Sequence, residues 1–257
     1  MSPVLKDKVA IITGASRGLG RAFAVRFAEE GARLLLTTTD LERAGGTVEE
    51  IKSKGGEVAI MKADISVESD TRKIAEKVMQ QYGRVDILVN NAAIWFGIRA
   101  KPWHMWTEEE WDRIFSVNVK GTWMVCKAIA PLMVKAGKGK IINIASNVAR
   151  VGGAHVYMPY ACGKGAIYTM THALARALGP SNINVNAVAP GFTATEASLD
   201  MSGPDKSFKT ATSGQSIPRR EEPGDLVGAT VFLASADSDF IAHHSMFIVC
   251  NPSRGLI

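Results

Sequence analysis

The sequence predicts an α/β fold in which one doubly wound parallel sheet is covered by helices on both faces. Short runs of aliphatic residues alternate with longer segments whose apolar residues recur at helical spacing, which is the pattern of repeated βα units. Polar residues or glycines follow the expected strands at one end, where ligands bind in folds of this kind. No linker, repeat or low-complexity segment divides the 257 residues, so we expect a single domain over residues 1–257.

The first half of the chain contains four expected strands and three expected helices. Each strand is a run of aliphatic residues, and each helix presents an apolar face and stops at or near a glycine. Ser66 is expected to cap the third helix, because the acids Glu68 and Asp70 follow it in the first turn. The strands are expected at 9–12, 33–38, 57–62 and 85–89, and the helices at 21–31, 41–54 and 67–82.

The second half begins with an irregular, aromatic-rich stretch at residues 94–106. Thr107 and Glu110 have the spacing of a capping box for a long helix that reaches about residue 136, and Pro131 is expected to kink or split this helix. Residues 193–218 are polar and small, and we expect them to form a mobile lid over the substrate. Further strands are expected at 140–145, 184–188 and 245–250, and further helices at 157–178 and 223–234.

Residues 13–20, Thr-Gly-Ala-Ser-Arg-Gly-Leu-Gly, place three glycines at the turn between the first strand and the first helix. Glycine lets the backbone turn tightly and lets an anionic ligand approach it closely. The start of the helix then offers free N–H groups and the positive end of a dipole to a pyrophosphate. The alternative is a glycine turn without a ligand, but the strand and helix around it favour a dinucleotide site.

The composition favours a protein that acts on small molecules. The formal net charge of +5 is mildly basic, but no dense Lys/Arg tract is present, so we expect no nucleic-acid partner. Residues 1–8 carry no apolar signal segment and no run is long enough to span a bilayer, so we expect a cytoplasmic protein without a membrane partner. The three cysteines and five histidines fit neither a disulfide framework nor a zinc pattern, and we expect no metal.

Tyr160 and Lys164 lie four residues apart, on one face of the helix expected at 157–178. A free tyrosine has a pKa of about 10 and is a poor acid or base at neutral pH. A nearby ammonium favours the phenolate and lowers that pKa, so we expect the pair to give and take a proton. Ser146 ends the preceding strand, where its hydroxyl would orient a substrate oxygen in the same cleft. The alternative is an exposed pair without a function.

Together with the glycine loop, these residues resemble the short-chain dehydrogenase/reductase family over nearly the whole chain. The motifs that carry the resemblance are T-G-x-x-x-G-x-G at 13–20, Asn90-Asn91-Ala92, Asn118, Ser146, Tyr160 with Lys164, and Pro190-Gly191. The resemblance implies a Rossmann-type fold and hydride transfer at the nicotinamide C4, coupled to proton transfer through Tyr160. It also implies that Ser146 holds the substrate oxygen, that Lys164 acidifies Tyr160 and binds the nicotinamide ribose, and that Asn118 completes a proton relay.

The resemblance further implies a set of cofactor contacts. Asp64 and Ile65 would flank the adenine, and Thr193 would touch the nicotinamide carboxamide. The expected cofactor-binding residues are Gly14, Ser16, Arg17, Gly18, Leu19, Gly20, Thr39, Asp64, Ile65, Asn90, Asn91, Tyr160, Lys164, Pro190, Gly191 and Thr193.

The choice between NAD and NADP depends on the end of the second strand. An acid at that position binds the adenosine ribose diol and rejects a 2′-phosphate. Here the position is Thr38, followed by Thr39, and Asp40 comes two residues late. Arg17 in the glycine loop is suited to a phosphate, so NADP(H) is slightly favoured. The alternative is that Arg17 is solvated and Asp40 holds NAD(H).

Three features depart from the family pattern. Ala93 replaces a glycine after Asn-Asn-Ala, which adds a methyl group near the cofactor. Ser146 precedes Tyr160 by fourteen residues rather than the more usual thirteen, which would select Asn147; we prefer Ser146 because asparagine lacks the hydroxyl. The segment Cys250-Asn251-Pro252-Ser253-Arg254 replaces the usual Val-Asp-Gly-Gly, which leaves the local substrate wall and subunit contacts open.

Four aromatic residues lie in the irregular stretch near the expected cleft: Trp95, Phe96, Trp103 and Trp106. Aromatic residues usually pack in a core, which is the alternative here. Trp95, Phe96, Asn147 and Tyr157 are the expected substrate contacts, and they predict a bulky apolar or aromatic ketone or secondary alcohol.

Two other functions are consistent with parts of the sequence. One is a 3-oxoacyl thioester reductase acting on an acyl carrier protein. The other is a non-catalytic dinucleotide-binding regulatory protein, which would have no need for Tyr160, Lys164 or Ser146. The family commonly pairs the helices equivalent to 107–136 and 157–178, so the resemblance implies a homotetramer or a homodimer.

Overall fold

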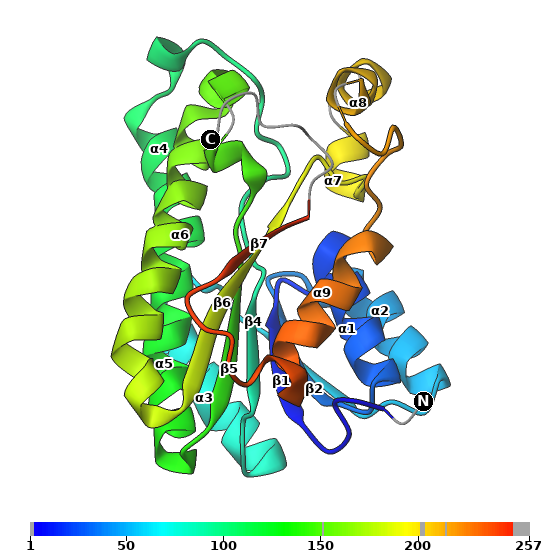
Figure 1. The fold of residues 1–257 in the computed structure, drawn as a ribbon, viewed down its shortest axis with the longest axis vertical. Helices are drawn as coiled ribbons and strands as arrows, with labels where there is room; N and C mark the ends of the chain where they lie inside the picture. The colour runs from blue at the N-terminus through cyan, green and yellow to red at the C-terminus, as the bar shows by residue number, and fades with distance from the viewer. Residues whose placement is uncertain (1–2, 151, 201–203, 214, 249–257) are drawn as a thin grey trace.

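The computed structural model describes residues 3–150, 152–200, 204–213 and 215–248. Its centre is a seven-stranded sheet in the order β3-β2-β1-β4-β5-β6-β7, and every pair of neighbouring strands is parallel (Figure 1). The strands are β1 (Val9–Thr13), β2 (Arg33–Thr38), β3 (Val58–Lys62), β4 (Ile87–Asn90), β5 (Gly139–Ile144), β6 (Ile183–Pro190) and β7 (Ser245–Ile248). The predicted Rossmann-type fold is confirmed. The expected end of the last strand at 249–250 and the unusual segment at 250–254 lie outside the described residues.

Helices cover both faces of the sheet, as predicted (Figure 1). Alternate side chains of β1 point to opposite faces: Ala10 and Ile12 belong to one core, and Val9 and Ile11 to the other. Burial of a large aliphatic side chain contributes about 1.5–3 kcal/mol, and both faces of the strand are fully buried. The first core lies under α1 (Gly18–Glu29), α2 (Leu41–Ser53) and α9 (Gly224–Ala234), and the second under α3 (Glu68–Tyr82), α5 (Thr122–Ala136) and α6 (Met158–Leu178).

The sheet reverses its direction of growth at β1, which pairs with β2 on one side and with β4 on the other. Helices from the two sides therefore diverge at the carboxyl ends of these strands and leave a crevice between them. The glycine loop follows β1, and the Asn90-Asn91 turn follows β4. The topology thus places these two motifs side by side at one edge of the sheet.

The start of α3 differs from the sequence expectation. The helix begins after Val67, which makes no side-chain capping hydrogen bond. Ser66 instead donates its hydroxyl to Asp64 Oδ1 at 2.6 Å, so the prediction that Ser66 caps this helix is wrong. The Asp70 carboxylate closes the turn from within the helix, because its Oδ2 accepts the Asp64 N–H at 3.1 Å.

The long helix expected from residue 107 starts with the predicted capping box between Thr107 and Glu110. The helix is nevertheless divided well before Pro131, and the segment that contains Pro131 continues as α-helix. The prediction of a break at Pro131 is therefore wrong. The three consecutive parts are α4 (Glu108–Phe115), a π-helical segment (Ser116–Gly121) and α5.

The π-helical segment coincides with two close contacts to neighbouring loops. A Cβ on Gly121 would lie 2.9 Å from Ile65 Cγ1, so only glycine admits Ile65 at this position. The side chain of Asn118 leaves the helix to bind the main chain of Ile94. Single π-helical turns are common at functional sites, and this one holds both the loop after β3 and the loop after β4.

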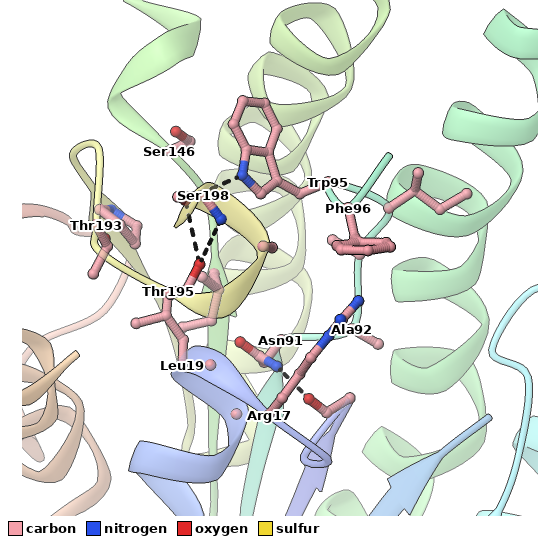
Figure 2. A pocket seen from close by; sticks show the side chains of 18 of the residues that line it. Arg17, Leu19, Asn91, Ala92, Trp95, Phe96, Ser146, Thr193, Thr195 and Ser198 are labelled. Carbon is pink, nitrogen blue, oxygen red and sulfur yellow. Dashed lines mark hydrogen bonds between the residues drawn. The ribbon is translucent and has the colours of Figure 1, made fainter. Parts of the chain in front are cut away.

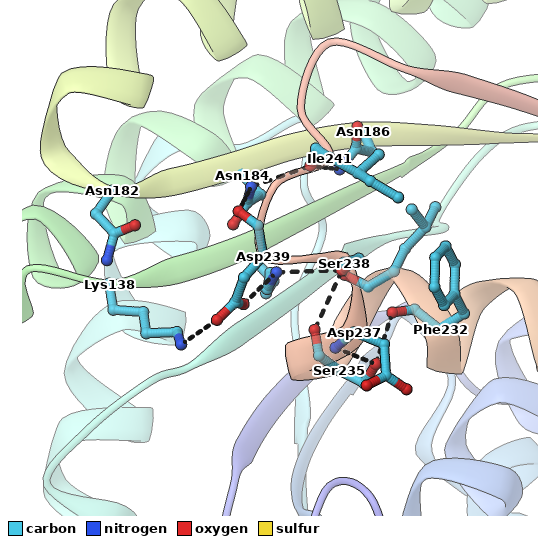
Figure 3. A network of polar contacts seen from close by, with 12 residues as sticks. Lys138, Asn182, Asn184, Asn186, Phe232, Ser235, Asp237, Ser238, Asp239 and Ile241 are labelled. Atoms are coloured by element: carbon cyan, nitrogen blue, oxygen red, sulfur yellow. Dashed lines mark hydrogen bonds and ion pairs between the residues drawn. The ribbon is translucent and has the colours of Figure 1, made fainter.

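Polar side chains at the amino end of the sheet hold the connection to β7 (Figure 3). Asn184 and Asn186 of β6 donate to the main-chain carbonyl of Ile241 at 3.0 and 2.8 Å. Asp239 pairs with Lys138 at 2.8 Å, which ties the same connection to β5. These bonds satisfy main-chain groups that have no partner in the sheet, and they place β7 beside β6.

The segment expected as a lid contains two short helices, α7 (Glu196–Leu199) and α8 (Pro204–Thr212). Phe208 of α8 is buried, and its ring lies 4.5 Å from the ring of Phe192, just before the segment. This aromatic contact anchors α8 over the end of β6. The mobility of residues 193–218 stays a prediction.

Candidate active site

The carboxyl ends of the strands open into a cleft of about 980 Å³. The glycine loop, the turns after β4, β5 and β6, and α7 form its walls (Figure 2). It therefore lies at the expected reversal point of the sheet. The predicted site residues that line it are Gly14, Ser16, Arg17, Gly18, Leu19, Gly20, Thr39, Asp64, Ile65, Asn91, Trp95, Phe96, Ser146, Asn147, Tyr157, Tyr160, Lys164, Pro190, Gly191 and Thr193.

Two predicted site residues, Asn90 and Asn118, are not among the residues that line the cleft. Asn90 is buried, and its Nδ2 donates to Asn143 Oδ1 at 2.9 Å. Asn118 is 1% exposed; its Oδ1 accepts the Ile94 N–H at 2.7 Å, and its Nδ2 donates to the Ile94 carbonyl at 3.1 Å. Both side chains hold the frame of the cleft, and the relay role of Asn118 stays a prediction.

The glycine loop is packed tightly against the turn after β4. Gly14 has a φ of +66°, and a Cβ there would lie 2.7 Å from Ala92 Cα. A Cβ on Gly20 would lie 2.2 Å from the Gly14 carbonyl oxygen. Asn91 Nδ2 donates to that same oxygen at 3.0 Å. Glycine is required at both positions because the backbones approach each other, and the two motifs form one rigid wall.

The helix α1 begins at this wall without a capping side chain. Arg17 is its N-cap residue and makes no side-chain capping hydrogen bond. The N–H groups of a first helical turn have no partner within the helix, and together with the helix dipole they attract anions. The Gly18 N–H is bound by a carboxylate, Glu196 Oε2, at 3.0 Å. The donor set therefore fits an anion such as the pyrophosphate of a dinucleotide.

Two arginines line the end of the cleft beside β2. Arg17 comes from the glycine loop and Arg43 from the first turn of α2. They are close enough that the charge of Arg43, after burial, contributes to lowering the pKa of Arg17. Asp40 uses Oδ1 to accept the Arg43 N–H at 3.0 Å and so caps α2. This end of the cleft therefore combines two guanidinium groups with one acid already engaged in a cap.

Tyr160, Ser146 and Lys164 meet on the wall formed by α6 and the end of β5. The Ser146 side chain lies near enough to the Tyr160 phenol to lower its pKa, and Ser146 Oγ accepts the Val148 N–H at 3.3 Å. Lys164 Nζ lies 5.7 Å from the centroid of the Tyr160 ring and donates to the Ile144 carbonyl at 2.6 Å. Asn147 also lines the cleft, but Ser146 is the one of the two that acts on the pKa of the phenol, which supports the choice of Ser146.

Burial shifts the pKa values of Tyr160 and Lys164 in opposite directions. Desolvation raises the pKa of the Tyr160 phenol above its ordinary value, and the nearby Ser146 side chain opposes this only in part. Burial also lowers the pKa of Lys164 to about 8. In this arrangement the Lys164 ammonium is bonded to the Ile144 carbonyl, and its effect on the pKa of Tyr160 stays a prediction. A phenol that keeps its proton at neutral pH can act as an acid.

The indole of Trp95 lines the cleft and lies beside Ser198 (Figure 2). Its ring centroid lies 4.7 Å from that of Tyr160 and 5.3 Å from that of Tyr157. Its Nε1 donates to Ser198 Oγ of α7 at 3.4 Å. Trp95 therefore joins Tyr160 of α6 to Ser198 of α7, and its ring forms an apolar surface beside the phenol.

The remaining aromatic residues of the same stretch divide between the cleft and the outside. Phe96 lines the cleft, and the guanidinium of Arg17 lies 4.2 Å above its ring. Trp103 is 64% exposed and Trp106 contacts Lys101, and neither lines the cleft. The aromatic wall is thus smaller than the sequence suggested, because the stretch turns away after Phe96.

Thr193 is held by a carboxylate behind the cleft wall. Its hydroxyl donates to Glu221 Oε1 at 2.5 Å, and the Gly191 N–H donates to the same atom at 3.1 Å. Glu221 is 8% exposed, and burial raises the pKa of its carboxyl group. The Thr193 proton therefore points to Glu221, which leaves the oxygen lone pairs of Thr193 for any ligand.

Sequence reasoning missed Arg43, Glu196, Ser198 and Glu221. Arg43 could have been predicted from the sequence, because it follows the capping residue Asp40 and so belongs to the first turn of the helix beside the glycine loop. The other three lie in or beside the polar stretch expected as a lid, where no periodicity predicts which side chains turn inward.

The described residues also bear on metal sites, membrane spans and disulfides. Among the described residues, no group of three or more His, Cys, Asp or Glu side chains is arranged to hold a metal ion. Within the described chain, no helix is both long enough and apolar enough to cross a membrane. Cys126 is buried and Cys162 is exposed, and both are free thiols.

Comparison with known proteins gives consistent results. The sequence model of a family described as short chain dehydrogenase matches residues 8–203. The chain is 39% identical over 247 residues to a galactitol 2-dehydrogenase of Agrobacterium fabrum, covering 92% of this chain and 94% of that protein. It is 36% identical over 244 residues to the (2S)-[(R)-hydroxy(phenyl)methyl]succinyl-CoA dehydrogenase subunit BbsD of Thauera aromatica, covering 95% and 96%.

Two further matches extend this picture. A 3-oxoacyl-[acyl-carrier-protein] reductase of Thermotoga maritima is 35% identical over 237 residues, covering 92% of this chain and 94% of that protein. The crystal structure of a levodione reductase superposes with a TM-score of 0.90 at 28% identity, covering 95% of this chain and 96% of that chain. The relatives thus share the fold and differ in the alcohol or ketone that their names specify.

Proposed function

Because the chain belongs to the short-chain dehydrogenase family, we propose that it is an NAD(P)-dependent oxidoreductase that interconverts a secondary alcohol and a ketone or aldehyde. One observation carries the proposal: Tyr160, Ser146 and Lys164 meet on one wall of a cleft whose opposite side is the glycine loop. The first group is suited to move a proton, and the loop is suited to hold an anionic nucleotide.

The nucleotide would bind along the residues of the predicted cofactor set. Gly18 and its neighbours would hold the pyrophosphate, Asp64 and Ile65 would flank the adenine, and Thr193 would accept a hydrogen bond from the carboxamide. The bound nicotinamide supplies the hydride chemistry. Asn90 is assigned a supporting role only, because its side chain is engaged by Asn143.

The chain's own residues then handle the substrate oxygen. Tyr160 donates its phenolic proton to the oxygen during reduction, and its raised pKa keeps that proton in place until charge develops on the substrate. Ser146 binds the same oxygen and orients it. Lys164, charged below about pH 8, would bind the nicotinamide ribose and favour charge development at Tyr160. Asn118 would act by positioning the loop that carries Ile94.

We propose NADP(H) as the preferred nucleotide, with NAD(H) as the alternative. Arg17 and Arg43 stand at the end of the cleft where a 2′-phosphate would lie, and guanidinium groups bind phosphate in a bidentate manner. Thr39 is exposed beside them. Asp40 is the only acid in the turn after β2, residues 39–40, and its engagement in the cap of α2 disfavours the alternative.

The substrate is proposed to be bulky and apolar or aromatic. Trp95, Tyr157 and Phe96 present aromatic surface inside the cleft, and Asn147 adds one polar group. A pocket with large apolar walls and few polar groups suits such a ligand. The similarity to a dehydrogenase whose named substrate carries a phenyl group supports this choice.

A 3-oxoacyl thioester reductase is the second candidate, favoured by the similarity to a reductase of that name. A non-catalytic dinucleotide-binding protein is less favoured, because it would have no use for Tyr160, Ser146 and Lys164 together on one wall of the cleft. We further propose a cytoplasmic homotetramer or homodimer in which residues 107–136 and 157–178 pair between subunits. Trp123, 44% exposed on α5, is available for such a contact.

The test is an assay of purified protein against a panel of ketones, secondary alcohols and 3-oxoacyl thioesters with both nucleotides. We expect nicotinamide-dependent turnover, with NADPH preferred to NADH and aromatic ketones preferred to acyl thioesters. Binding of both nucleotides without turnover on any substrate would favour the regulatory alternative. Failure to bind either nucleotide would contradict the proposed function.

A further inference from the structure

A carboxylate of the lid segment occupies the position expected for a phosphate oxygen. Glu196 Oε2 accepts the Gly18 N–H at 3.0 Å, although the two residues are 178 positions apart in the sequence. Gly18 is the first residue of α1, a helix of 12 residues, so its N–H has no partner within the helix. The hydrogen bond joins α7 to the glycine loop across the mouth of the cleft.

The Glu196 carboxylate occupies the acceptor position of the Gly18 N–H. A Cβ placed on Gly18 would lie 3.6 Å from Glu196 Oε2 and 3.5 Å from Thr195 Cβ. A phosphate oxygen that accepted the Gly18 N–H would need the position that Oε2 holds. The carboxylate also acts on the nearest cation of the loop: burial and Arg43 lower the pKa of Arg17, and the charges of Glu196 and Asp200 partly oppose this. Glu196 thus engages the same donor and the same charge that a nucleotide would use.

We propose that Glu196 is an affinity-determining residue of the nucleotide site, whose carboxylate holds the Gly18 N–H and is displaced when the pyrophosphate binds. This inference rests on the proposed function, since it assigns the Gly18 N–H to the pyrophosphate. Displacement of Glu196 breaks one of the bonds that fasten α7 to the glycine loop. The affinity for the nucleotide is therefore lower than the loop alone would give, and the lid segment is released as the nucleotide enters.

Two substitutions separate charge from hydrogen bonding. Glu196→Gln keeps the size and an acceptor oxygen but removes the charge, and Glu196→Ala removes both. Each is expected to lower the dissociation constant for NADPH about three- to tenfold, because one charge-assisted hydrogen bond no longer has to be broken. Asp200→Asn is the matched control: Asp200 lies on the same segment and also acts on Arg17, but among the described residues it is the Glu196 carboxylate, and not that of Asp200, that binds the loop. The control is expected to change the dissociation constant by less than about twofold.

Hydrogen exchange of the Gly18 amide, measured without nucleotide, gives a readout that needs neither binding nor turnover. The amide is expected to be protected in the wild type and in Asp200→Asn, and to exchange faster in Glu196→Ala. Glu196 is exposed, so these variants are expected to keep the wild-type unfolding temperature.

The outcomes separate this inference from the proposed function. Unchanged or weaker NADPH binding in both Glu196 variants overturns the inference. An equal gain in NADPH affinity in Asp200→Asn overturns it too, because the affinity would then depend on net charge alone. Unchanged Gly18 exchange in Glu196→Ala overturns it as well. If the wild type binds no nucleotide, the proposed function fails, whereas the exchange experiment still decides whether Glu196 holds Gly18.

Discussion

The indole ring of Trp95 lies against the phenol ring of Tyr160, with the centroids 4.7 Å apart and the ring planes inclined by 45°. Trp95 comes from the loop after β4 and Tyr160 from α6, so two distant segments build one surface. The residue proposed to deliver the proton and the residue proposed to shape the substrate are therefore packed together. We therefore expect Trp95 to limit the size of a substrate whose oxygen reaches the phenol.

Replacing Trp95 with alanine should change selectivity more than chemistry. Loss of the indole removes apolar contact for a large substrate, and we expect kcat/KM for an aryl ketone to fall about tenfold or more, with a smaller change for a small aliphatic ketone. The two substrates are measured side by side. Trp103→Ala is the control, because Trp103 comes from the same stretch but does not line the cleft. An unchanged ratio between the two ketones would show that Trp95 is no part of the substrate wall.

Removal of the Tyr160 hydroxyl should separate catalysis from nucleotide binding. In Tyr160→Phe we expect kcat to fall by a factor of about 10² to 10⁴, the range for loss of a general acid, with the dissociation constant for NADPH within about twofold of wild type. Tyr157→Phe is the matched control, since Tyr157 also lines the cleft and also contacts Trp95. Turnover that survives in Tyr160→Phe but is lost in Tyr157→Phe would move the acid to the other tyrosine.

The lowered pKa of Lys164 predicts a pH dependence of nucleotide binding. The buried ammonium loses its proton at about pH 8, well below the ordinary value for lysine, so the charged donor is present at pH 7 and largely absent at pH 9.5. We expect the affinity for NADPH to decrease as the pH rises through about 8 in the wild type. Lys164→Met should bind more weakly at pH 7 and show no such step. Titrations from pH 6 to 9.5 at constant ionic strength decide this, and a flat wild-type profile would exclude a charged Lys164 from the nucleotide site.

The elements that sequence reasoning predicted well depend on local rules. Glycines at 14 and 20 are required by backbone approach, which the G-x-x-x-G-x-G spacing already indicates. Tyr160 and Lys164 share a face because helical periodicity places residues four apart together. The strands follow from aliphatic runs, and the parallel direction of the sheet follows from their alternation with helices.

The elements that were missed depend on contacts between distant segments. The pKa of Tyr160 is set by how deeply α6 and the Trp95 loop bury the phenol, and composition carries no information on that depth. The long helix is interrupted where Gly121 faces Ile65 and Asn118 binds Ile94, and not at Pro131. Glu221 is buried only because the chain returns beside Thr193 after α8. Each of these requires the tertiary fold first.

Nucleotide preference should depend on the two arginines at the end of β2. Each charge-assisted bond to a 2′-phosphate is worth about 1.5–3 kcal/mol, so Arg17→Ala and Arg43→Ala should each lower the kcat/KM ratio of NADPH to NADH about tenfold or more. Arg21→Ala is the control: Arg21 lies on α1 near Arg17, but it pairs with Glu50 at 2.9 Å and does not line the cleft.

A preference for NAD(H) predicts the opposite effect of a substitution at Asp40. If Asp40 holds the ribose diol of NADH, Asp40→Asn should weaken NADH, and both arginine variants should leave the ratio unchanged. If NADP(H) is preferred, Asp40→Asn should instead favour NADPH slightly, because a negative charge beside the 2′-phosphate is removed while the amide oxygen can still accept the Arg43 N–H. The two readings therefore differ in the sign of the Asp40 effect, which steady-state kinetics with both nucleotides measures directly.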